Sequence, residues 1–96
     1  MGRRETLIQT DILMYLRARK DIYGVNVSVN ISTAKGTPDL LVCCKGRFVG
    51  LEIKRPDGSY GTTRPQEMRI AAIRRAGGVA EVVTSIADVA ALLSSL

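Results

Sequence analysis

Histidine and tryptophan are absent from this 96-residue chain, and other aromatic residues are scarce, with one Phe and three Tyr. The absence of histidine argues against the usual zinc sites of proteins, so any bound metal would be held by oxygen ligands. With so few aromatic side chains, the core must be built from Ile, Leu, Val and Ala. The chain therefore predicts an aliphatic core and no zinc chemistry of the common kind.

Cysteine is also rare, and the placement of the two residues present makes them poor disulfide partners. Cys43 and Cys44 are adjacent within an expected strand, so their side chains point to opposite faces. The same divergence makes them poor joint ligands for a metal. We interpret both as small core residues of a protein in a reducing compartment.

Long apolar runs are missing as well. The first 20 residues contain two acids and five bases, and no apolar run approaches the ~18 residues of a membrane span. We therefore expect neither a signal peptide nor a membrane association, and a cytoplasmic location, in the host cytoplasm if the chain is viral. A length of 96 residues predicts one domain, residues 1–96, small enough that a partner subunit would help to stabilise it.

Hydrophobic periodicity predicts the order helix, three strands, helix, strand, helix. The expected elements are a helix over 5–19, strands over 25–32, 40–44 and 48–53, a helix from about Pro65 to Gly77, a strand over 79–83 and a helix from Ser85 through Leu93. The alternating strand 25–32 is expected at an edge, whereas 40–44 and 48–53 are apolar enough to be buried on both faces. A helix between the last two strands implies a crossover, and so an α/β fold with a mixed sheet flanked by helices.

Two acidic residues should face each other across the central hairpin. If Lys45-Gly46 is a two-residue turn, Cys44 pairs with Arg47, and counting outwards places Asp39 opposite Glu52. Opposed residues of an antiparallel pair have Cβ atoms roughly 4.5–5.5 Å apart. Both carboxylates could then hold one hard divalent cation.

Lys54 is expected on the same face as Glu52, two residues along the strand. Two acids for a metal and one cation for a phosphate or a water are the minimum equipment for cutting a phosphodiester. Each half has a plainer interpretation, since Asp after Pro is common in turns and Glu-x-Lys can be a solvated strand edge. Charges inside apolar runs need a reason, however, and paired carboxylates repel each other unless a metal or a proton offsets them. We therefore favour a metal site.

Glu5 and Gln66 each have two interpretations. Glu5 heads the apolar stripe of the first helix and should point towards the sheet, but an acid in a first helical turn is favourable by itself. Gln66 opens the second helix, where it could orient a water or contact a phosphate. It could equally complete a capping box with Thr63.

The charge balance points to a polyanionic partner. The chain has 14 basic and nine acidic residues, a net charge of +5. If Glu5, Asp39 and Glu52 surround a metal, six acids remain against 14 bases, which favours nucleic acid. The bases that end the first helix also suit its dipole. The better candidates for phosphate contacts are Arg47, Arg55, Arg64 and Lys35.

Four short motifs, in order and in place along nearly the whole chain, resemble the VRR-NUC branch of the PD-(D/E)xK nuclease superfamily. They are Glu5 with Ile8-Gln9, Gly36-Thr37-Pro38-Asp39-Leu40, Gly50-Leu51-Glu52-Ile53-Lys54, and Pro65-Gln66. The resemblance implies a restriction-endonuclease-like sheet in the order αβββαβα. It also implies that Asp39, Glu52 and Glu5 form the Mg²⁺ or Mn²⁺ site, that Lys54 positions the water or stabilises charge, and that Gln66 matches the glutamine of the second helix.

The resemblance implies a Mg²⁺- or Mn²⁺-dependent endonuclease that hydrolyses phosphodiester bonds in DNA. Small stand-alone members are similar to Holliday junction resolvases, so branched or four-way junction DNA and a homodimer are expected. Two alternatives remain open from the residues. The chain could be a non-catalytic nucleic-acid-binding module, or a subunit of a recombination or packaging complex.

Overall fold

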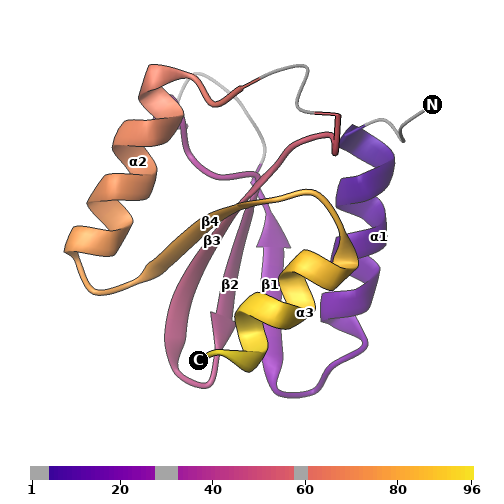
Figure 1. The fold of residues 1–96 in the computed structure, drawn as a ribbon. Helices are drawn as coiled ribbons and strands as arrows, with labels where there is room; N and C mark the ends of the chain where they lie inside the picture. The colour runs from indigo at the N-terminus through magenta and orange to yellow at the C-terminus, as the bar shows by residue number, and fades with distance from the viewer. Residues whose placement is uncertain (1–4, 28–32, 58–60) are drawn as a thin grey trace.

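The computed structural model describes residues 5–27, 33–57 and 61–96. It contains a mixed sheet of four strands that is flanked by helices (Figure 1). The elements are α1 (Glu5–Arg17), β1 (Ile22–Asn26), β2 (Leu40–Cys44), β3 (Arg47–Ile53), α2 (Arg64–Arg75), β4 (Val79–Val83) and α3 (Ile86–Ser94). This is the order αβββαβα, so the predicted α/β fold with a mixed sheet is confirmed.

The strands lie in the order β1-β2-β3-β4, with antiparallel pairs up to β3 and a parallel pair between β3 and β4. At the hairpin, Cys44 pairs with Arg47, as the sequence predicts. Lys45 and Gly46 have φ values of 54° and 75°. Both are in the left-handed region that a two-residue turn of type I′ requires. The turn therefore fixes the register of the two central strands.

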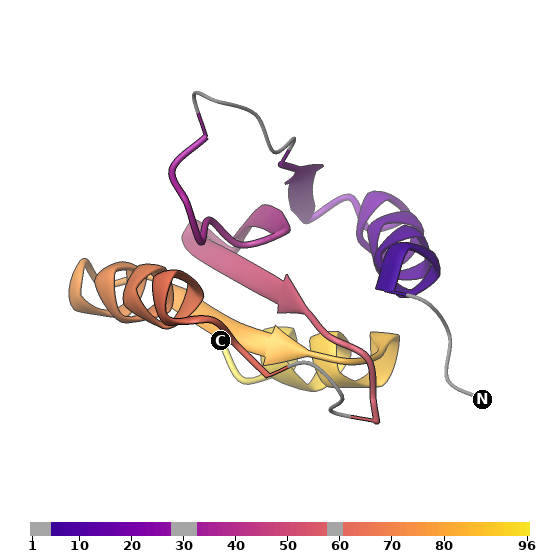
Figure 2. The ribbon, with the colours of Figure 1, turned by 90° about the horizontal axis from the view of Figure 1, so that it is seen from above.

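The helices divide between the two faces of the sheet. Viewed from above, α1 and α3 lie on one side and α2 on the other (Figure 2). α1 contacts β1, β3 and α3, whereas α2 contacts β3 and β4. The core lies under α1 and α3, where aliphatic side chains from both helices and the sheet are buried. Its largest fully buried members include Ile12, Leu16, Leu40, Leu51, Ile53 and Leu93.

The face that carries α2 is covered only beside β3 and β4. Over β1, β2 and the first residues of β3 it is open, with Tyr23 of β1 73% and Phe48 of β3 49% exposed. Cys43 is exposed on this face, so its prediction as a core residue is wrong, whereas Cys44 is buried as expected. Likewise β2 is not buried on both faces, but the five residues 49–53 of β3 are all buried.

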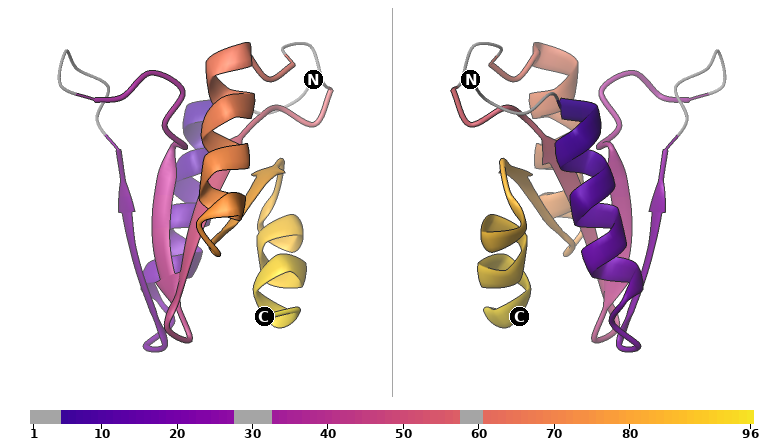
Figure 3. Two further views of the ribbon diagram at one scale, coloured as in Figure 1. Left: turned by 90° about the vertical axis from the view of Figure 1, so that its left-hand side faces the viewer. Right: turned by 90° about the vertical axis from the view of Figure 1, so that its right-hand side faces the viewer.

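The outer strand differs from its prediction. β1 covers Ile22–Asn26 rather than starting at residue 25, and residues 28–32 lie outside the described part of the chain. Pairing with β2 decides these bounds, because Ile22 is opposite Cys44 and Asn26 is opposite Leu40. The edge position is as expected, and β1 is the outermost strand on the side away from α3 (Figure 3). Within the described residues, no helix is both long enough and apolar enough to cross a membrane.

Candidate active site

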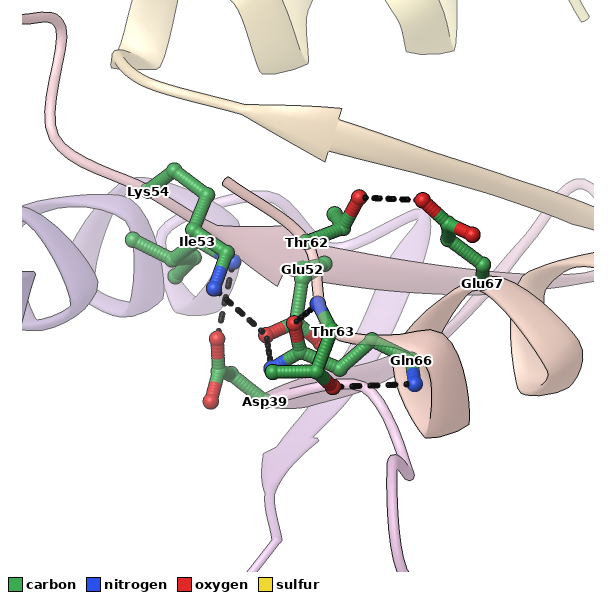
Figure 4. Close-up of polar contacts among 8 residues, drawn as sticks. All are labelled: Asp39, Glu52, Ile53, Lys54, Thr62, Thr63, Gln66 and Glu67. Carbon is green, nitrogen blue, oxygen red and sulfur yellow. Dashed lines mark hydrogen bonds and ion pairs between the residues drawn. The ribbon is translucent and has the colours of Figure 1, made fainter. Parts of the chain in front are cut away.

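Asp39 and Glu52 meet at the end of the central hairpin, where β3 leaves the sheet (Figure 4). Asp39 directly precedes β2. Its Oδ2 accepts a hydrogen bond of 2.8 Å from the backbone N–H of Ile53. Its backbone carbonyl accepts another, of 2.9 Å, from the N–H of Val27. Main chain and side chain are both held, so the carboxylate of Asp39 has a fixed position beside β3.

Glu52 is the buried charged residue of the core, with only 2% of its surface exposed. Its Oε1 accepts a hydrogen bond of 2.8 Å from Nε2 of Gln66, and Nζ of Lys54 lies 4.0 Å from the same oxygen (Figure 4). Its Oε2 is buried and has no hydrogen-bond partner among the described residues. A buried acceptor without a partner costs about 1–3 kcal/mol. Among the described residues, one lone-pair site on Glu52 is thus left open to a further group.

Gln66 combines the two roles that the sequence left open. Its Oε1 accepts a hydrogen bond of 2.9 Å from the N–H of Thr63, and its own N–H donates to Oγ1 of Thr63 at 3.3 Å. This is the predicted capping box at the start of α2. The side-chain nitrogen of Gln66, Nε2, donates to Oε1 of Glu52. The cap therefore also orients the buried carboxylate.

The environment raises the pKa of Glu52 from 4.5 to about 8. The largest cause is burial, which disfavours the charged form, followed by the negative charge of Asp39. The ammonium of Lys54 acts in the opposite direction and lowers the pKa. At neutral pH the isolated site therefore retains a proton on Glu52 that a cation between the two carboxylates would displace.

A tight backbone contact joins the loop before Asp39 to α2. Gly36 has a φ of +86°, and a Cβ at this position would overlap the backbone of Pro65 and Gln66. Only glycine allows this approach. The loop that leads into Asp39 and the helix that carries Gln66 are consequently locked together.

Similar solved structures share this arrangement of elements. One, described as a VRR_NUC domain protein, has a TM-score of 0.78 and 23% identity, covering 98% of this chain and 88% of its own. A second, described as a VRR_NUC domain, has a TM-score of 0.72 and 23% identity, covering 94% of each chain. The chain has the VRR-NUC fold. No family sequence model matches the chain, and no curated protein matches it by sequence.

The metal that the VRR-NUC resemblance implies fits the donors present. The carboxylates of Asp39 and Glu52 are hard oxygen ligands, which Mg²⁺ and Mn²⁺ prefer. A cation would satisfy the buried Oε2 of Glu52, which has no other partner among the described residues. It would also offset the repulsion that raises the pKa of Glu52. The two carboxylates thus suit a cation that completes its shell with water or substrate oxygens.

Glu5 does not complete a cluster of three ligands. Within the described residues, no three Asp, Glu, Cys or His side chains are grouped closely enough to hold one ion. Glu5 lies at the start of α1, and its negative charge contributes only the smallest cause of the raised pKa of Glu52. The role of Glu5 as a third metal ligand stays a prediction. Glu5 acts on the site through its charge.

The predicted phosphate contacts are scattered. Arg47 begins β3, five residues from Glu52, which is roughly 17 Å along an extended strand, so its expected position near the site is wrong. Arg55 directly follows Lys54, and Arg64 is the first residue of α2. Lys35 is exposed in the loop that packs on α2. Arg47 follows the turn between β2 and β3, whereas Asp39 and Glu52 lie at the opposite, open end of this hairpin.

Sequence reasoning missed Arg69, which ties this loop to α2. Nε of Arg69 donates a hydrogen bond of 3.0 Å to the backbone carbonyl of Lys35. The signal was available, since Arg69 is three residues after Gln66 and therefore one turn further on nearly the same face of α2.

Proposed function

We propose that this protein is a metal-dependent endonuclease that hydrolyses phosphodiester bonds in DNA. One observation carries the proposal: the buried carboxylate of Glu52 lies beside Asp39 and Lys54, and its Oε2 has no hydrogen-bond partner in the described part of the chain. A purely structural role would leave the buried Oε2 unsatisfied, at a cost in stability of about 1–3 kcal/mol. Sites that perturb a pKa so strongly are often functional sites.

In this proposal Asp39 and Glu52 hold the cation. A bound Mg²⁺ or Mn²⁺ supplies Lewis-acid chemistry, lowering the pKa of a water and offsetting negative charge on the phosphate. The N–H of Ile53 and the amide of Gln66 keep the two carboxylates in place. The ammonium of Lys54 is 13% exposed and can donate to the attacking water or to a phosphate oxygen. These residues position and polarise; none has to form a covalent bond with the substrate.

The proposed substrate is branched DNA, cut by a homodimer. The net charge of +5 favours a polyanion. A monomer has one site and could only nick a strand, whereas a twofold dimer presents two sites to two strands. Size-exclusion chromatography with light scattering should therefore give twice the chain mass of 10.4 kDa.

The decisive experiment is cleavage of a labelled four-way junction and of a linear duplex with the same arms. We expect cleavage with Mg²⁺ or Mn²⁺, none with EDTA, and loss of cleavage in Asp39→Asn. Glu81→Gln is the matched control, because it removes an exposed carboxylate on β4 that pairs with Arg74. If wild type cuts neither substrate with either ion, or if Asp39→Asn cuts as well as wild type, the nuclease proposal is wrong.

Calorimetry with Mn²⁺ separates this proposal from a non-catalytic nucleic-acid-binding module. A nuclease of this kind binds Mn²⁺ through Asp39 and Glu52, so Asp39→Asn should abolish the binding heat. A binding module in which both acids are structural would bind DNA in a salt-sensitive way with no dependence on metal. A subunit of a recombination or packaging complex would instead require its partners for either property.

A further inference from the structure

A hollow runs along α2 outside the buried carboxylate pair. It has a volume of about 370 Å³ and is lined by Lys35, Pro65, Met68, Arg69, Ala72 and Arg75, which together we name the α2 groove. A second hollow of about 320 Å³ shares Arg69 and Ala72 with it and reaches Leu41 and Phe48 on the open face of the sheet. The groove is therefore part of a longer depression beside the helix.

The α2 groove is cationic. Lys35, Arg69 and Arg75 line it without an acidic residue among the lining side chains. No carboxylate of the described residues forms an ion pair with any of these three. Arg74, on the same helix, differs because it bonds to the carbonyl of Ala80 and to Glu81. The three groove cations thus present uncompensated charge to solvent.

The groove is also rigidly built. Arg69 donates through Nε to the carbonyl of Lys35, which fixes the plane of its guanidinium and leaves the other two nitrogens directed elsewhere. Gly36 packs against the backbone of Pro65 next to this bond. Met68 is 62% exposed and gives the groove an apolar element. Such a surface suits a ligand with both anionic and apolar parts.

The groove begins next to the candidate active site in the chain, because Pro65 in its lining directly precedes Gln66. Gln66 bonds to Glu52, and at 1.5 Å per residue Arg69 and Arg75 lie about 4.5 and about 13.5 Å further along the helix axis. Arg69 and Arg75 are thus about 9 Å apart along that axis, close to the rise of two to three nucleotides at about 3.4 Å each. A strand that passes from the active site onto the groove face of α2 would bring successive phosphates to these cations.

We propose that the α2 groove binds the phosphate backbone of the nucleic-acid strand on one side of the cleaved bond. Lys35, Arg69 and Arg75 contact the phosphates, and Met68 packs against a sugar or a base. The identity of the ligand rests on the proposed function, whereas the site is separate from the metal ligands. An acidic protein segment is the competing occupant that the experiment must exclude.

The test measures DNA binding by fluorescence anisotropy in EDTA, over a series of salt concentrations, so that cleavage is excluded. The variant is Lys35→Gln with Arg75→Gln, which keeps the backbone carbonyl that Arg69 holds. The matched control is Arg74→Gln, which removes the same type of charge one residue away. Thermal melting of each protein checks that the fold is retained.

We expect the double variant to bind DNA about tenfold more weakly, with the slope of log K against log salt reduced by about two. The control should bind within about twofold of wild type. The inference is overturned if the double variant matches the control, or if wild type binds no DNA. Cleavage assays on the same proteins distinguish the two proposals. If the wild type binds DNA tightly through the groove but does not cleave it, the nuclease proposal is wrong and the groove proposal stands. If all variants bind and cleave DNA equally well, the groove proposal is wrong and the nuclease proposal stands.

Discussion

Replacing Glu52 with Gln should stabilise the metal-free protein at high pH while destroying its metal site. The substitution keeps the shape of the side chain and an oxygen that can accept from Gln66. It removes the ionisable group that is buried beside Asp39. We therefore expect a gain in the free energy of unfolding that grows with pH.

The magnitude follows from the pKa of Glu52, which is about 8 in the folded protein against an ordinary 4.5. Between these two values the folded state binds more protons than the unfolded state, so the stability of the wild type falls as pH rises. Below pH 4.5 the group is protonated in both states and costs nothing. Above pH 8 the full penalty is present, on the order of 5 kcal/mol at about 1.4 kcal/mol per pH unit.

Urea unfolding in EDTA between pH 5 and pH 9 measures the effect. The wild type should lose stability across this window, whereas Glu52→Gln should have a nearly flat profile and exceed the wild type by a few kcal/mol at pH 9. Glu81→Gln, which removes an exposed acid, should follow the wild type. Mn²⁺ should restore stability to the wild type at high pH, since it binds only the folded state, and should leave Glu52→Gln unchanged. Parallel pH profiles for wild type and Glu52→Gln would refute the reasoning.

Four other substitutions test the surrounding contacts. Gln66→Ala removes the side-chain half of the capping box and the bond to Glu52, and should lower stability by about 2 kcal/mol and weaken Mn²⁺ binding about tenfold or more. Thr63→Ala removes only the other half of the capping box, the bond from the N–H of Gln66 to Oγ1. Calorimetry distinguishes the two, and equal Mn²⁺ affinities would contradict the positioning role. Lys54→Met should raise the pKa of Glu52 further, which carbon NMR would detect as a later titration; an unchanged or lower pKa argues against the contact. Gly36→Ala should cost about 2 kcal/mol or more, because its φ is positive and a Cβ would meet Pro65; an unfolding free energy within about 0.5 kcal/mol of wild type would contradict this.

Local sequence determined the elements and the pairing that builds the site. The turn at Lys45 and Gly46 fixes the hairpin register by its own dihedral preferences, and strand alternation then places Asp39 and Glu52 on one face. The capping box of Thr63 and Gln66 was legible for the same reason, since it involves residues only three apart. Turns and caps that involve residues close in the sequence can be predicted from it, because few distant contacts compete with their local interactions.

Tertiary packing decided which side chains are buried and which distant residues are in contact. It alone buries Glu52 against Gln66 and so raises its pKa, and it leaves Cys43 on the open face because α2 covers only the other half of the sheet. The bond between Arg69 and Lys35 spans 34 residues, a separation at which no local pattern carries information. The burial of a side chain, the coupling between two charges and the shape of a groove all depend on residues that are distant in the sequence. They are therefore set by how the helices pack on the sheet.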